Sequence, residues 1–122
     1  MARLAAMSSP LGSPVPACVV ADIPEDAVLL DVREDDEWAA GHAPAAVHVP
    51  MGQVVARIDE IASAVADRPV HVICRSGGRS AQVTAYLRRA GWEAVNVDGG
   101  MRAWAAASRP MVTDSNAPPR VI

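Results

Sequence analysis

The sequence predicts an α/β fold with a mainly parallel five-stranded sheet and helices on both faces. Two observations support this prediction. Short apolar runs of strand length alternate along the chain with segments of helical periodicity, which is typical of parallel strands joined by helices. Runs such as residues 27–32 and 70–73 are apolar almost throughout rather than at every second position, as in strands buried on both faces.

The first half of the chain is expected to contain three short strands and one helix. A turn at Pro24 follows the first apolar run, and Pro50 ends the third. The second run ends where the chain becomes charged, at Arg33. The short helix is expected to stop at Gly41. The strands are predicted at residues 17–20, 27–32 and 46–49, and the helix at residues 34–40.

The second half is expected to contain three helices and two strands. Residues 51–66 carry apolar side chains at helical spacing, including Val54, Ile58, Ile61 and Val65, which predicts one amphipathic helix. The remaining strands are predicted at residues 70–73 and 93–97, and the remaining helices at residues 79–90 and 101–107.

These elements form one domain, at residues 15–110 of the 122-residue chain, which is large enough to fold without disulfides. Residues 1–14 are expected to be a flexible tail, because serines and prolines interrupt an apolar patch shorter than a secretory signal requires. Residues 111–122 lack periodicity and carry prolines, so an extended or disordered tail is expected there.

Composition narrows the classes of function. The chain is 51% hydrophobic but has no apolar run long enough to cross a membrane, so no membrane partner is expected. A net charge of −3 gives no reason to expect a nucleic-acid partner. Two cysteines, Cys18 and Cys74, exclude a disulfide-rich scaffold. A reactive Cys74 must stay reduced, which predicts a cytoplasmic location.

The segment that carries the chemistry follows the strand at residues 70–73. It begins with Cys74 and continues into a glycine-rich turn and a helix. The glycines let the backbone N–H groups curl around the sulfur, and the helix N-terminus adds positive potential at the same point. Cys74 is therefore predicted to be a low-pKa nucleophile. The loop predicted to bind the sulfur comprises Arg75, Ser76, Gly77, Gly78, Arg79 and Ser80.

The length of this loop favours sulfur over phosphate. Four residues separate Cys74 from Arg79, whereas cysteine-dependent phosphatases have one residue more. The shorter loop makes a cradle too small for a tetrahedral phosphate but adequate for a terminal sulfur. A small phosphatase or an arsenate reductase is kept as a less favoured alternative.

Four ordered motifs give the chain its resemblance to single-domain rhodaneses, the thiosulfate sulfurtransferase family. Besides the Cys74 loop, the chain resembles this family at residues 29–34, at residues 37–50, and at the closing Gly-Gly-x-x-x-Trp segment of residues 99–104. Ser108 stands where a glycine usually closes the last helix of the family. The similarity spans residues 16 to 110 and implies a rhodanese-like fold.

The resemblance implies a sulfur transfer in two steps. Cys74 takes a sulfane sulfur from a small anionic donor such as thiosulfate and holds it as a persulfide. A thiol acceptor then removes the sulfur, either a low-molecular-weight thiol or a thioredoxin-like protein, with cyanide as acceptor in the assay. No cofactor and no metal are implied. The alternative within the same family is a persulfide carrier or interaction module that a partner protein supplies with sulfur.

Other residues are candidates for supporting roles. Arg75 is expected to face solvent and attract the donor, whereas Arg79 either acts electrostatically on the sulfur or braces the fold through a carboxylate such as Glu37. Asp31 and Arg33 are expected to pair at a strand end rather than to act as acid and base. His42 is expected to hydrogen-bond the backbone near its turn.

Cys18 leaves two interpretations open. It is either a half-buried structural thiol or a resolving thiol that attacks a persulfide on Cys74.

Overall fold

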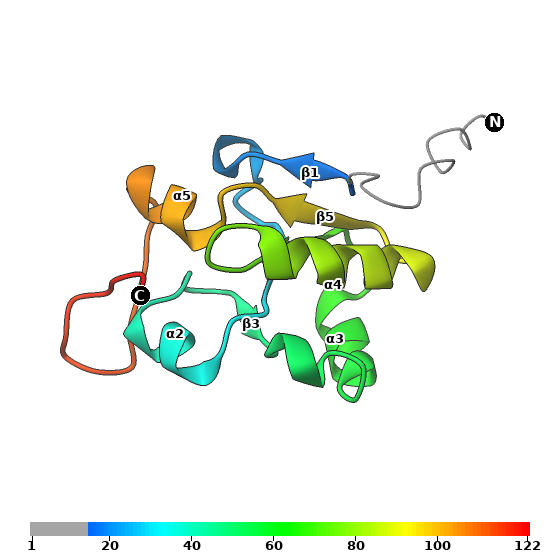
Figure 1. Ribbon diagram of the computed structural model, residues 1–122, viewed down its shortest axis with the longest axis horizontal. Helices are drawn as coiled ribbons and strands as arrows, with labels where there is room; N and C mark the ends of the chain where they lie inside the picture. Colours follow the sequence, from blue (N-terminus) through cyan, green and yellow to red (C-terminus); the bar gives the residue numbers. More distant parts are fainter. Residues whose placement is uncertain (1–14) are drawn as a thin grey trace.

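A five-stranded sheet organises the computed structural model, which describes residues 15–122 (Figure 1). Its strand order is β1-β5-β4-β2-β3, and every neighbouring pair is parallel. The predicted α/β class and parallel sheet are confirmed. The strands are β1 (Ala17–Cys18), β2 (Val28–Asp31), β3 (Val47–His48), β4 (Val70–Ile73) and β5 (Ala94–Val97).

Helices connect the strands and cover both faces of the sheet. None of the helices within residues 15–122 has the length and apolar character needed to cross a membrane. The α-helices are α2 (Asp35–Ala40), α3 (Ile58–Val65), α4 (Gly78–Arg89) and α5 (Gly100–Ala106), and two 3-10 turns are η1 (Val20–Asp22) and η2 (Met51–Gln53).

The prediction of one helix over residues 51–66 is wrong. The segment divides into η2 and α3, because the Gln53 and Val54 N–H groups donate to the carbonyl oxygens three residues back, at Pro50 and Met51, as in a 3-10 turn, and α3 begins only at Ile58. Gly52 lies in this turn and has low helix propensity. The predicted first strand is also too long, since Val20 already begins η1.

Two apolar clusters pack against the two faces of the sheet. Side chains of β4 alternate between them, with Val72 and Cys74 in one cluster and Ile73 in the other. The first cluster is closed by α3 and α4, and the second by η1 and α5. The nucleophile candidate thus projects from the central strand toward the face that α4 covers.

The last helix ends in a left-handed residue. Ser108 has a φ of 56°, in the region that favours glycine, and its N–H donates to the carbonyl oxygen of Ala105 at 2.9 Å. The position at which the family usually has glycine is therefore a position whose backbone suits glycine.

Residues 111–122, here called the C-terminal strap, leave α5, bend at residues 114–117 and return toward α2 as a loop (Figure 1). Val112 pairs with His42 in an isolated antiparallel bridge, and the Arg120 N–H donates to the carbonyl oxygen of Ala40 at 2.9 Å. Met111 and Val121 pack against the second apolar cluster. The predicted tail thus lies along the domain surface, whereas the predicted tail at residues 1–14 lies outside the described residues.

Candidate active site

Cys74 lies at the junction between β4 and the loop that leads into α4. Its side chain is only 1% exposed. The sulfur accepts a hydrogen bond from the Gly77 N–H at 3.1 Å and another from the Ser80 hydroxyl at 3.2 Å. Both donors belong to the first turn of α4 or to its N-cap, so the positive end of a 12-residue helix is directed at the sulfur.

The loop lowers the pKa of the Cys74 thiol despite its burial. Burial raises the pKa, because a thiolate is poorly solvated there. Hydrogen bonds from the Ser80 hydroxyl and from the backbone N–H groups of Ser80, Gly77 and Ser76 favour the thiolate and together outweigh burial. The result is a buried sulfur whose surroundings favour the thiolate more than those of an ordinary cysteine, which suits nucleophilic chemistry.

Asn96 holds the loop from the neighbouring strand β5. Gly77 has a φ of 117°, and its carbonyl oxygen accepts a hydrogen bond of 3.2 Å from the Asn96 side-chain amide. Asn96 was not singled out as a site residue from the sequence. The available signal was a polar amide within an otherwise apolar strand, because such a residue requires a specific partner when it is buried.

The start of α5 holds the other side of the loop. The Met101 N–H donates to the carbonyl oxygen of Cys74 at 2.8 Å, and the Arg102 N–H donates to that of Arg75 at 3.0 Å. A side chain at Gly100 would overlap both carbonyl oxygens, and Gly100 has a φ of 55°. The Gly-Gly segment therefore shapes the active-site loop as well as the last helix, a role that the sequence alone did not indicate.

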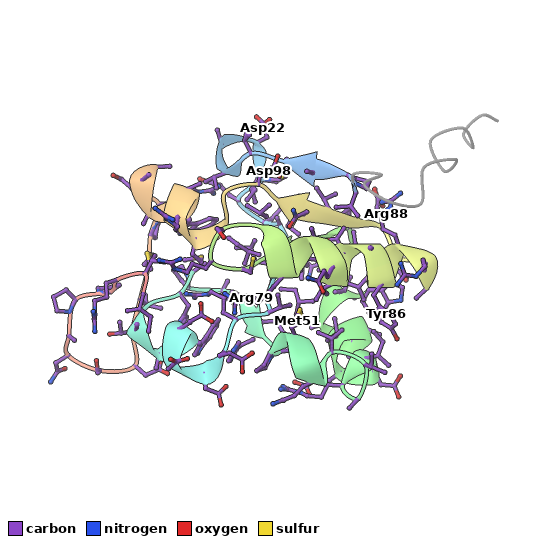
Figure 2. All side chains as sticks on the ribbon, in the orientation of Figure 1. Asp22, Met51, Arg79, Tyr86, Arg88 and Asp98 are labelled. Carbon is purple, nitrogen blue, oxygen red and sulfur yellow. The ribbon has the colours of Figure 1, made fainter. Side chains whose placement is uncertain are left out.

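Arg79 forms a bidentate ion pair with Glu37 of α2. The two hydrogen bonds measure 2.7 and 2.8 Å, and Figure 2 shows Arg79 on the side of α4 that faces this region. Hydrogen bonding to Arg79 lowers the pKa of Glu37 to about 2, against the opposing effect of its partial burial. Two roles were expected for Arg79, an electrostatic effect on the sulfur and a contact with Glu37 that braces the fold. The contact with Glu37 is present. Arg79 also lies close enough to Cys74 for a thiolate there to raise the pKa of Arg79 further.

Asp31 and Arg33 form a fully buried pair at the end of β2. The Arg33 guanidinium donates to Asp31 at 2.8 Å and also to the carbonyl oxygens of Glu37 and Gly41. Arg33 therefore connects the sheet to both ends of the α2 region. Asp31 and Arg33 thus contact each other and the backbone, which is the pairing at a strand end that was expected from the sequence rather than acid–base catalysis.

Two histidines enclose the Trp38 ring on α2. His42 stacks on one side with ring centroids 3.5 Å apart, and His48 stacks with centroids 4.5 Å apart. A ring nitrogen of His42 bonds the Trp38 carbonyl oxygen, and one of His48 bonds that of Arg33. Both imidazoles are thus engaged with the backbone, and within residues 15–122 no group of three His, Cys, Asp or Glu side chains is arranged to hold a metal ion.

Arg75 is exposed, as expected, but it has a partner. Its Nε donates to a main-chain oxygen of Ile122, in the C-terminal strap, at 2.9 Å. Of the other loop residues, Ser76 is exposed, and Gly78 begins α4 with open space around its Cα.

Cys18 lies on the other side of the sheet from Cys74. It packs against the second apolar cluster, whereas Cys74 belongs to the first. Partial burial and the carboxylates of Asp22 and Asp98, which Figure 2 labels beside β1, raise the pKa of Cys18. This geometry favours the structural interpretation over a resolving thiol.

Comparisons with known proteins find chains that are similar over most of the described domain. A family model described as the rhodanese-like domain matches residues 16–107. A sulfurtransferase of Allochromatium vinosum is 43% identical over 89 residues, which cover 72% of this chain and 80% of that protein. A thiosulfate sulfurtransferase of Pseudomonas savastanoi pv. phaseolicola is 37% identical over 83 residues, covering 67% of this chain and 76% of that protein.

A solved structure has a similar fold. A rhodanese-related protein from Thermoplasma volcanium superposes with a TM-score of 0.74 at 27% identity, covering 81% of this chain and 99% of that one. Together with the relatives, this likeness supports a sulfur-transfer role.

Proposed function

The chain belongs to the rhodanese-like domain family, and from that premise we propose that it is a sulfurtransferase that carries a sulfane sulfur on Cys74. The observation that carries the proposal is the environment of the Cys74 sulfur. A nearly inaccessible thiol receives two hydrogen bonds from the start of α4 and has a lowered pKa. Such donors favour an anionic sulfur, which both the free thiolate and the persulfide require.

The proposed reaction has two steps. In the first, the Cys74 thiolate attacks the outer sulfur of thiosulfate, the sulfur–sulfur bond of the donor breaks, and sulfite leaves with the bonding electron pair. In the second, an acceptor thiolate attacks the terminal sulfur of the Cys74 persulfide. The acceptor leaves as a persulfide, and the Cys74 thiolate is restored. Such double displacement predicts ping-pong kinetics.

The loop residues have distinct parts in this scheme. The Gly77 N–H and the Ser80 hydroxyl stabilise the sulfur anion. The Arg79 guanidinium, which Glu37 holds in place, adds positive charge near it. Asn96 and the start of α5 hold the loop in the conformation that presents these donors. Thiosulfate as donor is supported by the name of the Pseudomonas relative.

A persulfide carrier that a partner protein supplies is the second candidate. The observation that favours it is the hydrogen bond between Arg75 and Ile122, since the loop cation best exposed to a small anionic donor already has a partner. In this alternative the same Cys74 persulfide forms, but its sulfur comes from another protein.

The deciding experiment is the mass of the intact protein after incubation with thiosulfate and then with cyanide. Sulfur transfer predicts a gain of one sulfur atom that cyanide removes, absent in Cys74→Ser and retained in Cys18→Ser. A gain in Cys74→Ser would refute the assignment of the nucleophile. Without any gain from thiosulfate, a gain from a protein persulfide donor would establish the carrier. Turnover of an aryl phosphate would instead support a phosphatase.

A further inference from the structure

The C-terminal strap reaches the active-site loop and engages its exposed arginine. Arg75 follows Cys74 directly in sequence, and its Nε donates to a main-chain oxygen of Ile122 at 2.9 Å, across 47 residues of chain. An exposed guanidinium on the residue that follows a buried cysteine of lowered pKa is a natural first contact for a small anion. In this structure one of the five N–H donors of that guanidinium, the one on Nε, is already taken by the main chain of the strap.

Several contacts hold the strap in this position. Its N–H groups at Val112 and Arg120 donate to the carbonyl oxygens of His42 and Ala40, and Val121 packs against the second apolar cluster. The fit over Gly41 is close. A Cβ at Gly41 would lie 2.7 Å from both the backbone nitrogen and the backbone oxygen of Arg120.

We propose that the C-terminal strap is an autoinhibitory element that sets donor specificity by competing with small anionic donors for Arg75. The proposal rests on the proposed sulfurtransferase function. An anionic donor must break the bond between Arg75 and Ile122 before it can use the Nε of Arg75. The energy of one exposed hydrogen bond from the Arg75 guanidinium predicts that the strap lowers the affinity for thiosulfate about three- to tenfold.

The two half-reactions separate this effect from a general loss of activity. The strap competes at the donor step, whereas the acceptor step begins from a persulfide that has already formed. Releasing the strap should therefore raise kcat/KM for thiosulfate about three- to tenfold. It should leave kcat/KM for dithiothreitol, used as an uncharged thiol acceptor, unchanged.

Gly41→Ala is the variant that releases the strap. Gly41 has a φ of 165°, which any residue adopts, so the added methyl acts through its overlap with Arg120 and with the terminal methyl of Met111 at 2.8 Å. Gly52→Ala is the matched control, since a Cβ at Gly52 meets nothing within 4 Å. Val121→Ser provides a second release by weakening the apolar contact of the strap.

The release should act through Arg75. In an Arg75→Ala background, Gly41→Ala should no longer raise kcat/KM for thiosulfate. An unchanged or lower kcat/KM for thiosulfate in both Gly41→Ala and Val121→Ser, with Arg75 intact, would overturn the proposal. A lower value would indicate instead that the strap positions Arg75 for the donor.

Amide hydrogen exchange tests the competition without any sulfur transfer. Sulfate carries the charge of the donor but no sulfane sulfur. In Cys74→Ser, sulfate should accelerate exchange of the Arg120 N–H relative to chloride at equal ionic strength, and the added Arg75→Ala change should abolish the acceleration. No response to sulfate would contradict the strap proposal. Absence of a Cys74 persulfide from every donor would contradict the sulfurtransferase function alone.

Discussion

Arg79 and Glu37 join the nucleophile helix to α2 through two parallel hydrogen bonds of 2.7 and 2.8 Å. Glu37 also accepts the Glu34 N–H at 3.0 Å and so completes the capping box at the start of α2. A single carboxylate thus orients the arginine of the active-site loop and caps a helix. The position of Arg79 beside Cys74 depends on an element that precedes it by about forty residues in sequence.

Glu37→Gln should make the protein less stable and change its acid response. The pKa of Glu37 is depressed from 4.5 to about 2 in the folded state, so its stabilising contribution is complete above pH 4.5 and is lost as the pH falls toward 2. Because the pair is partly exposed, we expect a loss of about 1 kcal/mol at neutral pH. Urea denaturation between pH 2 and pH 7 measures both effects. An equally steep acid loss in Glu37→Gln would contradict this assignment.

Ser80→Ala should raise the pKa of Cys74. The variant removes the hydroxyl that donates to the sulfur at 3.2 Å, while burial continues to disfavour the thiolate. We expect the midpoint of the pH profile for alkylation by iodoacetamide to move to higher pH, measured in a Cys18→Ser background. Ser63→Ala, at an exposed position of α3, is the control. Identical profiles for the two variants would show that the hydroxyl does not stabilise the thiolate.

Gly100→Ala and Gly78→Ala should change stability in opposite directions. A methyl at Gly100 overlaps the carbonyl oxygens of the active-site loop at a positive φ, which should cost about 2 to 4 kcal/mol and displace the loop. A methyl at Gly78 meets nothing within 4 Å at the first position of α4 and should stabilise by about 0.5 kcal/mol. Thermal unfolding distinguishes the two, and equal effects would refute the close approach at Gly100.

Arg33→Met should be strongly destabilising. It leaves the Asp31 carboxylate buried without its cation and removes donors to two backbone carbonyl oxygens. The expected loss is about 3 to 5 kcal/mol in the free energy of unfolding. Arg57→Met removes the partner of Glu60 in an exposed pair and should have little effect. If both variants unfold at the same urea concentration, the buried pair is not a major support of the α2 region.

Ser108→Gly should stabilise the protein. Ser108 has a φ of 56°, and glycine adopts this conformation without the steric cost that a Cβ imposes. The expected gain is about 0.5 to 1 kcal/mol, because the greater freedom of glycine in the unfolded chain offsets part of the relief. Ala107→Gly, at a φ of −84°, should destabilise instead. A loss of stability in Ser108→Gly would contradict the argument from strain.

Much of the fold follows from local patterns in the sequence. The five strands lie where apolar runs predict them, and β4 has the predicted bounds, because strand length, burial and turn residues are local properties. The single helix predicted at residues 51–66 was wrong for a different reason. Helical spacing of apolar residues shows which face is buried, but it does not show that i→i+4 hydrogen bonds run without interruption, and residues 50–54 make i→i+3 bonds instead.

The sequence by itself determined the chemistry available to the site: a cysteine at a strand end, glycines after it, and a helix whose N-terminus follows within a few residues. Only the tertiary structure decided which partners the two loop arginines take. Arg79 pairs with Glu37 from α2, and Arg75 bonds Ile122 from the strap, although both arginines belong to one short loop. Local sequence sets backbone conformation, whereas the partner of a long charged side chain depends on which distant segments the packed sheet brings within reach.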